Sequence, residues 1–275
     1  MTNASWLYDI TILLYALSVL GYFIDFLQNS RKVNQFAFWL LSIVWVLQSA
    51  FLVTQIIEIG GFPILTPFEG LFFYAWVIVS LSLLINWFFR VDFFVFFANV
   101  LGFSIMAINL FATREQASSL LTEQLMSELS IIHITMAFLS YGAFSLSFIF
   151  SIMYLILYQM LKRKKWNKRL RRFGDLSQLE KLSYLCSVLG VPLLLLSLIL
   201  GIVWAILKVD QFSLFDAKVI ISFFVLGAYS TYLYQKVARE MEGRSLALWN
   251  VAAFLIVLIN VFLSGTLSEF HFWYV

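Results

Sequence analysis

Long apolar runs separated by short polar segments make up most of this chain. A run of about 20 apolar residues is long enough to cross the hydrocarbon core of a bilayer as an α-helix, because each residue adds about 1.5 Å. The candidate spans are Trp6–Leu27, Phe36–Ile57, Phe68–Phe89, Phe93–Phe111, Ile131–Met160, Leu182–Leu207, Leu214–Tyr234 and Ala247–Leu267. The fourth run ends among the polar residues Asn109 and Thr113. The pattern predicts an all-α membrane bundle of about eight transmembrane helices, forming a single transmembrane domain over residues 1–275.

Composition supports this interpretation and narrows the classes of protein. Hydrophobic residues make up 62% of the chain and charged residues only 12%, too few to cover a soluble domain. The single cysteine, Cys186, lies in an apolar run, so the chain cannot form an internal disulfide or a CxxC redox pair. The sequence carries no phosphate-binding glycine loop, no HExxH motif and no Ser/His/Asp arrangement, so we expect no enzymatic activity.

The distribution of Lys and Arg predicts the orientation. With eight spans, 15 of the 18 basic residues fall in loops on one side of the membrane, which is the cytoplasmic side in most membrane proteins. Both termini are therefore expected to be extracytoplasmic, in a multi-pass protein of the cell (plasma) membrane.

Two connecting segments stand out. The basic loop 162–181 is expected in the cytoplasm, where each basic residue near anionic lipid contributes about 1 kcal/mol; docking of a soluble enzyme is the second interpretation. Its basic run is short and next to the membrane, so we expect no nucleic-acid binding. The external segment 112–130 is amphipathic and is either a helix on the membrane surface or a solvated connector.

A few polar residues have simple structural interpretations. Asp25, near the cytoplasmic end of the first span, is expected to reach the interface beside Arg31 and Lys32. Glu69 suits the positive end of the third helix. Ser177 and Glu180 have the spacing of a capping box.

The two histidines offer the clearest candidate chemistry. His133 begins the fifth span and His271 follows the eighth, so both are expected at the outer surface. At helical spacing, His133 shares a face with small residues, which mark membrane helices that pack on another helix: Ala137, Ser140, Phe144, Ser147 and Ser151. Two neutral imidazoles can hold a haem iron between them. The alternative is that each histidine is an ordinary anchor at the membrane interface.

Four segments then carry a resemblance to a known family. They are FPILTPFEGLFFYAW (62–76), IIHITMAFLSYGAF (131–144), GIVWAILKVDQFSLFDAKVIISFFVLGAYSTYLY (201–234), and EGRSLALWNVAAF (242–254) followed by SEFHFW (268–273). In order and spacing the chain resembles the cytochrome c assembly family of haem-handling membrane proteins, and within it the HemX type.

The resemblance implies a set of haem-binding residues. His133 and His271 match the two outer histidines that are the family's proposed haem ligands. Asp216 and Lys218 match the family's Trp-x-Trp-Asp-x-Lys loop, in which Ser213 and Phe215 replace the tryptophans here, and Trp204 matches a tryptophan upstream of it. The family's inner membrane histidines have no counterpart, because Tyr234 stands where one would be, so an inner bis-histidine site is excluded.

The resemblance also implies a function. A HemX-type protein is expected to regulate tetrapyrrole and haem biosynthesis by lowering the level of glutamyl-tRNA reductase, a possible partner at the basic loop 162–181, while binding haem at the outer histidines. One alternative is an auxiliary haem-handling role in cytochrome c assembly. The other is a small-molecule transporter, for which Pro192 beside Gly190 in the sixth span is the only hint of a broken helix.

Overall fold

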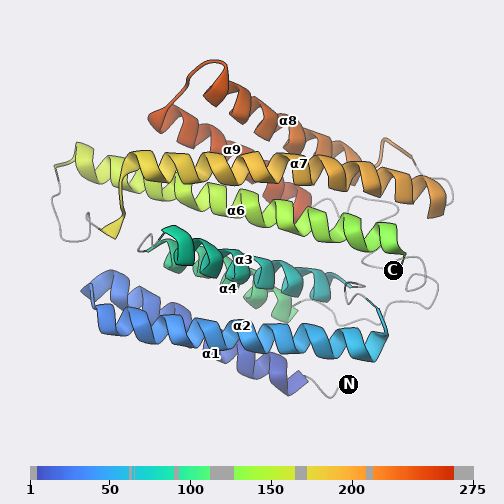
Figure 1. Ribbon diagram of the computed structural model, residues 1–275, viewed down its shortest axis with the longest axis horizontal. Helices are drawn as coiled ribbons and strands as arrows, with labels where there is room; N and C mark the ends of the chain where they lie inside the picture. The colour runs from blue at the N-terminus through green and yellow to red at the C-terminus, as the bar shows by residue number, and fades with distance from the viewer. Residues whose placement is uncertain are drawn as a thin grey trace. The chain divides into compact units, whose positions relative to one another are not determined.

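The chain folds into helices that form two compact units. The computed structural model describes residues 5–61, 64, 66–89, 93–111, 127–164, 172–208 and 213–262, and in this part of the chain all regular structure is helical (Figure 1). Unit 1 comprises residues 1–118 and 166–174, and unit 2 comprises residues 119–165 and 175–275. The expected all-α fold is therefore confirmed.

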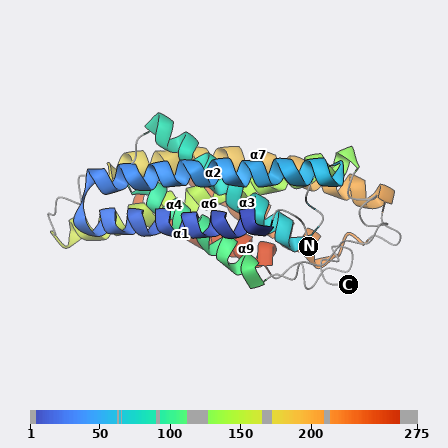
Figure 2. The same ribbon diagram turned by 90° about the horizontal axis from the view of Figure 1, so that it is seen from below.

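Unit 1 is built from two helical hairpins. Its α-helices are α1 (Ser5–Gln28), α2 (Arg31–Ile59), α3 (Pro67–Phe89) and α4 (Phe94–Ile108), and a 3-10 turn, η1 (Asn109–Phe111), follows α4. Figure 2 shows α1 and α2 running side by side over their length, joined by a tight connection.

The start of α3 shows why this helix begins where it does. The Glu69 carboxylate accepts a hydrogen bond from the Thr66 N–H at 3.0 Å, and the Thr66 hydroxyl accepts one from the Glu69 N–H at 3.4 Å. This reciprocal pair is a capping box, and Pro at the first helical position suits it because its missing N–H would have no helical partner. Glu69 thus has the structural role that the sequence suggests.

Seven described helices are long and apolar enough to cross a membrane; α4 is the shorter one. Its 15 residues correspond to about 22 Å, less than the roughly 30 Å hydrocarbon core. It falls within the expected fourth span. Asn109, in the turn η1 that follows α4, donates its side-chain N–H to the Phe68 carbonyl at 2.9 Å. Because the expected orientation depends on an even number of spans, the placement of both termini outside stays a prediction.

The expectation for Asp25 is wrong. The side chain of Asp25 is only 1% exposed, and its two carboxylate oxygens accept hydrogen bonds from the guanidinium of Arg172, both at 2.8 Å. Asn34 donates to the same carboxylate, and the Arg172 guanidinium lies 4.5 Å from the ring centre of Phe93. A planar guanidinium matches a carboxylate through two parallel bonds, so Arg172 satisfies this buried charge better than Arg31 or Lys32 at the interface could.

Unit 2 contains four described α-helices, α6 (Glu128–Lys162), α7 (Leu176–Lys208), α8 (Ala217–Val237) and α9 (Gly243–Phe262). The long helices α6 and α7 lie against each other over almost their whole length (Figure 1). The expected basic loop 162–181 is divided: Leu176 already begins α7, residues 172–174 belong to unit 1, and residues 165–171 lie outside the described residues. Most of the connector 112–130 also lies outside them, although Glu128–Ser130 form the first turn of α6.

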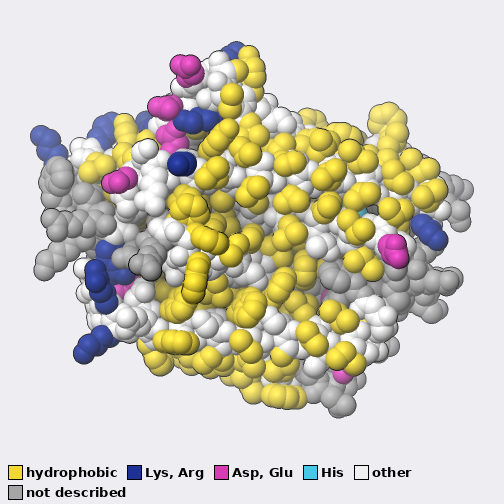
Figure 3. All heavy atoms as spheres, in the orientation of Figure 1, with side chains coloured by type: hydrophobic (Ala, Val, Ile, Leu, Met, Phe, Trp, Pro, Cys, Tyr) yellow, Lys and Arg dark blue, Asp and Glu magenta, His cyan; other side chains and the backbone are white. Residues whose placement is uncertain are grey.

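The surface of the helices suits a lipid environment. Figure 3 shows hydrophobic side chains covering most of the visible helix faces, with Lys and Arg side chains toward the ends of helices. Exposed large apolar residues occur in both units, for example Leu13, Trp39, Trp87, Leu189 and Phe224. Apolar surface of this extent is characteristic of contact with lipid tails rather than water.

Candidate functional site

The contact between α6 and α7 follows the face that the sequence predicts. The Ser140 hydroxyl donates to the Gly190 carbonyl at 2.9 Å, the Ser147 hydroxyl lies 2.7 Å from the Ser187 hydroxyl, and the Ser151 hydroxyl lies 3.0 Å from that of Ser183. The small polar side chains of α6 therefore meet small residues of α7, and the prediction that this face packs against a helix is confirmed.

At one end of this interface His133 is bound to α7. Its Nδ1 lies 2.6 Å from the carbonyl oxygen of Ser197 and 3.0 Å from the Ser197 hydroxyl oxygen. The same hydroxyl donates to the carbonyl oxygen of His133 at 3.0 Å. One serine thus contacts both the ring and the backbone of the histidine, so the imidazole points into the bundle and not toward lipid.

A glycine makes room for the imidazole. A Cβ added to Gly201 would lie 2.5 Å from Cε1, 2.7 Å from Nδ1 and 3.0 Å from Nε2 of His133. Carbon atoms approach one another no closer than about 3.5 Å without repulsion. The ring of His133 therefore lies directly on the backbone of α7 at Gly201, where any larger residue would displace it.

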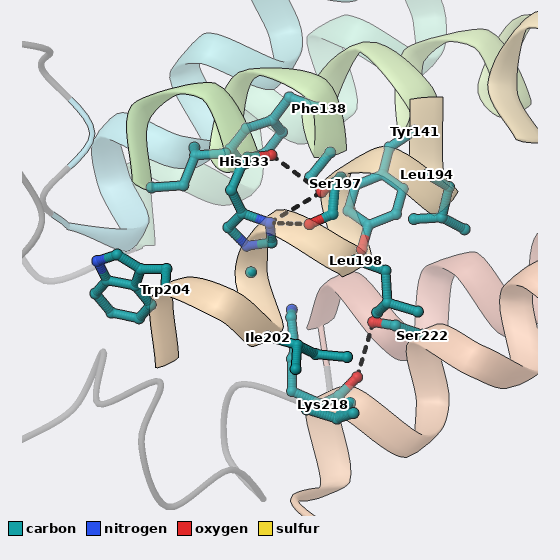
Figure 4. A pocket seen from close by; sticks show the side chains of 14 residues that line it. His133, Phe138, Tyr141, Leu194, Ser197, Leu198, Ile202, Trp204, Lys218 and Ser222 are labelled. Carbon is teal, nitrogen blue, oxygen red and sulfur yellow. Dashed lines mark hydrogen bonds between the residues drawn. The ribbon is translucent and has the colours of Figure 1, made fainter. Parts of the chain in front are cut away.

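The imidazole borders a cavity of about 110 Å³ formed by α6, α7 and α8. Figure 4 shows Ser197 on one side of the ring, Trp204 on another, and Lys218 extending from α8 toward it. The remaining walls are mainly apolar and aromatic, and include Phe138 and Tyr141. The Lys218 ammonium donates to the carbonyl oxygen of Asn260 at 3.1 Å, which brings the end of α9 to the same region.

At the other end of unit 2, charged groups connect the helices. The Glu180 carboxylate accepts hydrogen bonds from the Lys236 ammonium at 2.6 Å and from the Gly243 N–H, at the start of α9, at 2.9 Å. The predicted capping box of Ser177 and Glu180 is wrong, because α7 begins at Leu176 and Ser177 is already its second residue. Glu180 binds the ends of α8 and α9 and does not cap its own helix.

Comparison with known proteins identifies the family. The family model described as "Cytochrome C assembly protein" matches residues 64–271. This chain belongs to that family. The Protein HemX of Bacillus subtilis (strain 168) is 56% identical over 264 residues, covering 96% of this chain and 95% of that protein. The Protein HemX of Brevibacillus brevis is 50% identical over 277 residues, covering all of both chains.

Cytochrome c biogenesis proteins are more distant relatives. The Cytochrome c biogenesis protein CcsA of Chlamydomonas reinhardtii is 28% identical over 207 residues, which cover 72% of this chain and 56% of that protein. The similarity to HemX proteins extends over nearly the full length, so this member of the family resembles them more than it resembles CcsA.

The residues that the family resemblance implies for haem binding do not all lie at the cavity. His133, Trp204 and Lys218, from three different helices, lie around the same cavity. Asp216 caps α8, because its carboxylate accepts a hydrogen bond from the Lys218 N–H at 2.8 Å, and Phe215 is 86% exposed and does not line the cavity. His271 lies outside the described residues, so its distance from His133 is not defined.

The structure adds two residues that sequence reasoning missed, Ser197 and Gly201. Both belong to a row of small residues along α7 at helical spacing, together with Ser183, Ser187 and Gly190. This row is the counterpart of the small-residue face of α6. Its helical spacing is visible in the sequence of the sixth span.

The groups around the cavity fit one side of a haem. A haem iron takes a histidine nitrogen as an axial ligand, its macrocycle requires apolar and aromatic walls, and its carboxylates favour a cation. His133, Trp204 and Lys218 offer these three features at one place. The cavity volume of about 110 Å³ is below the roughly 300–1,000 Å³ that is usual for larger ligands, so the described walls would surround only part of a haem.

Proposed function

We propose that this protein binds haem at the end of unit 2 that carries His133, and that it regulates tetrapyrrole biosynthesis from the membrane. The observation that carries the first part is the convergence of His133, Trp204 and Lys218, from α6, α7 and α8, on one mainly apolar cavity. These residues are far apart in the sequence, so their convergence is a property of the fold.

Each residue has a defined role in this proposal. The imidazole of His133 would hold the iron, Trp204 would form an aromatic wall for the macrocycle, and the Lys218 ammonium would pair with a carboxylate of the haem. His271 would be the second histidine that holds the haem, as the family pattern implies. When bound, the haem supplies a redox-active iron, and the role of the protein is to hold it near the predicted outer surface.

Titration of the detergent-purified protein with hemin tests this site. The wild type should develop the Soret band of a low-spin haem with two histidine ligands, and His133→Ala and His271→Ala should each lose it. Ser140→Ala is the matched control, because it removes a polar contact between α6 and α7 without touching the cavity. A spectrum that is the same in the wild type and His133→Ala would overturn the assignment.

Lys218 allows a finer test of how the ligand is held. Lys218→Gln should weaken hemin binding about 10- to 100-fold, because it removes a charge-assisted contact of about 1.5–3 kcal/mol. Lys236→Gln changes the same residue type at the other end of α8 and should leave hemin binding unchanged. Equal effects of the two substitutions would argue against a carboxylate at Lys218.

The regulatory part of the proposal rests on the similarity to HemX proteins. The resemblance implies that the protein lowers the level of glutamyl-tRNA reductase, and the basic segment that begins at the end of α6 is the proposed contact. Lys162, Arg163 and Lys164 are described and exposed there. In this proposal they lie on the cytoplasmic side of the plasma membrane, where they can reach a soluble enzyme or anionic lipid.

Complementation tests this function. In Bacillus subtilis cells that lack HemX, this protein should reduce the amount of the reductase on an immunoblot. Replacement of Lys162, Arg163 and Lys164 by glutamine should abolish the reduction, whereas glutamine at Arg31 and Lys32, which are exposed at the start of α2, is the matched control. Reductase levels that are independent of this protein would exclude the regulatory role.

Membership of the cytochrome c assembly family favours a second candidate, an auxiliary role in haem handling for cytochrome c. The same cells distinguish the two. A loss of covalently attached haem in c-type cytochromes that this protein restores, with unchanged reductase levels, would support the second candidate in place of the first.

A further inference from the structure

The two ring nitrogens of His133 have different surroundings. Nδ1 faces two oxygen atoms of Ser197, the carbonyl at 2.6 Å and the hydroxyl at 3.0 Å. A carbonyl oxygen can only accept a hydrogen bond. The Ser197 hydroxyl has a single hydrogen, which it donates to the carbonyl oxygen of His133, so this hydroxyl also acts as an acceptor toward the ring. Both contacts therefore require a hydrogen on Nδ1.

The position of this hydrogen decides which atom can bind a metal. A neutral imidazole carries one hydrogen, so protonation of Nδ1 leaves the lone pair on Nε2. Among the described residues none is hydrogen-bonded to Nε2, and the ring borders the cavity of about 110 Å³. Histidines that ligate a metal usually donate their other ring N–H to a carbonyl or carboxylate, which is the arrangement at His133.

We propose that Ser197 and Gly201 are the positioning residues of His133, and that together they present Nε2 as the ligating atom. Ser197 fixes the tautomer and holds both the ring and the backbone of His133. Gly201 fixes the depth of the ring, because a Cβ at this position would lie 2.5–3.0 Å from three ring atoms. The identity of the ligated metal rests on the proposed haem function, whereas the tautomer does not.

The tautomer can be measured without haem. The His271→Ala variant contains a single histidine, so ¹⁵N-histidine labelling of the haem-free protein gives one pair of ring nitrogen signals. Magic-angle-spinning NMR should show a protonated Nδ1 and an unprotonated Nε2. A protonated Nε2, a doubly protonated ring, or rapid exchange between the tautomers would overturn the proposal.

Hemin affinity then tests the two positioning residues in the protein that retains both histidines. Gly201→Ala should weaken hemin binding about 10- to 100-fold, the range for residues that orient a metal ligand, with a change in the spin state of the bound haem. Gly227→Ala is the matched control, because a Cβ at Gly227 meets nothing within 4 Å. Unchanged affinity and spin state in Gly201→Ala would count against its role.

Ser197→Ala separates the hydroxyl from the carbonyl of the same residue. The carbonyl remains, so Nδ1 should stay protonated in the NMR experiment, but the ring loses one of its two contacts and hemin binding should weaken about tenfold. Ser187→Ala, on the same face of α7 but bonded to Ser147, should have no effect on hemin binding. Equal effects of the two serine variants would reduce Ser197 to a general packing role and refute the proposal.

The two proposals fail in distinguishable ways. A protonated Nδ1 in the His271→Ala variant, together with a wild-type protein that does not bind hemin, would refute the haem function and leave the positioning of the ring supported. Hemin binding that requires His133, with the hydrogen of the haem-free ring on Nε2, would refute the positioning alone.

Discussion

Two aromatic rings of α6 lie on glycines of α7 in the same way, but only one of them borders the candidate site. His133 lies on Gly201 and Phe144 lies on Gly190, where an added Cβ would be 2.5 Å from the nearest ring atom in each case. The step of eleven residues from His133 to Phe144 equals the step from Gly201 back to Gly190. The two antiparallel helices thus keep one register between these contacts.

The surroundings of the two rings differ. Phe144 is completely buried and stacks on Tyr229, with ring centres 3.7 Å apart, whereas His133 is half-buried beside a cavity. The comparison indicates that the site uses the same packing as the core of the interface. What makes it a candidate site is its position at the end of the interface, where a ring with a hydrogen-bonding edge faces space instead of another side chain.

The largest expected effect on stability is at the buried ring. Gly190→Ala should lower the free energy of unfolding by about 1–3 kcal/mol, because Phe144 is confined by Tyr229 and cannot move away from the new methyl group. Thermal unfolding in detergent measures this, with Gly227→Ala as the control that should stay near the wild type. Equal melting temperatures for the two variants would show that the interface is looser than its contacts indicate.

The next largest effect on stability is expected at Asn250, whose polar side chain lies beside the interface of α6 and α7. The side-chain amide nitrogen of Asn250, on α9, lies 2.6–2.9 Å from the hydroxyl oxygens of Ser147, Ser151 and Ser183, which share its two hydrogens. Asn250→Ala should lower the free energy of unfolding by about 1 kcal/mol, the usual scale for hydrogen bonds between membrane helices. A double-mutant cycle with Ser183→Ala should give less than the sum of the single effects, and strict additivity would contradict a shared network.

Stability should be less sensitive to a methyl group at Gly201, against the His133 ring at the end of the interface. Gly201→Ala should lower the free energy of unfolding by less than about 1 kcal/mol, because His133 can shift into the neighbouring cavity. The same thermal unfolding experiment provides the comparison with Gly190→Ala. A loss as large as that of Gly190→Ala would show that the two rings are equally confined and would remove the distinction between them.

The smallest effect on stability is expected for a single hydrogen bond of α6 that lies along the helix between His133 and Phe144. Ser140→Ala removes the donor to the Gly190 carbonyl and should lower the free energy of unfolding by about 0.5 kcal/mol. Its hemin affinity should equal that of the wild type, because Ser140 does not line the cavity. A loss of affinity would mean that the register of the whole interface, and not only its end, controls the site.

Much of the helical framework could be predicted from the sequence, because length and hydrophobicity alone determine which segments suit a bilayer. The ends of helices were less predictable. The polar stretch at 176–181 lacks the apolar signal of a span, yet it is the first turn and a half of α7, where Glu180 binds Lys236. The unbroken α7 also passes through Pro192 without the interruption that would support a transporter.

The candidate site was predictable only in part. His133 and its small-residue face follow from helical spacing, and Trp204 and Lys218 from the family resemblance. Ser197 and Gly201 were not found, because a serine and a glycine in an apolar helix have no individual signature. The partner of Asp25 could not be found either, because Arg172 lies 147 residues away and nearer basic residues offered a simpler pairing.

The sequence by itself determined that this chain is an all-α membrane protein of the cytochrome c assembly family, because apolar length and motif order are properties of the linear chain. Only the tertiary structure decided which atoms meet. It placed the Ser197 carbonyl against Nδ1 of His133, and Trp204 and Lys218 around the same cavity. The register between α6 and α7 depends on how side chains from distant segments fit together, and no local pattern specifies that fit.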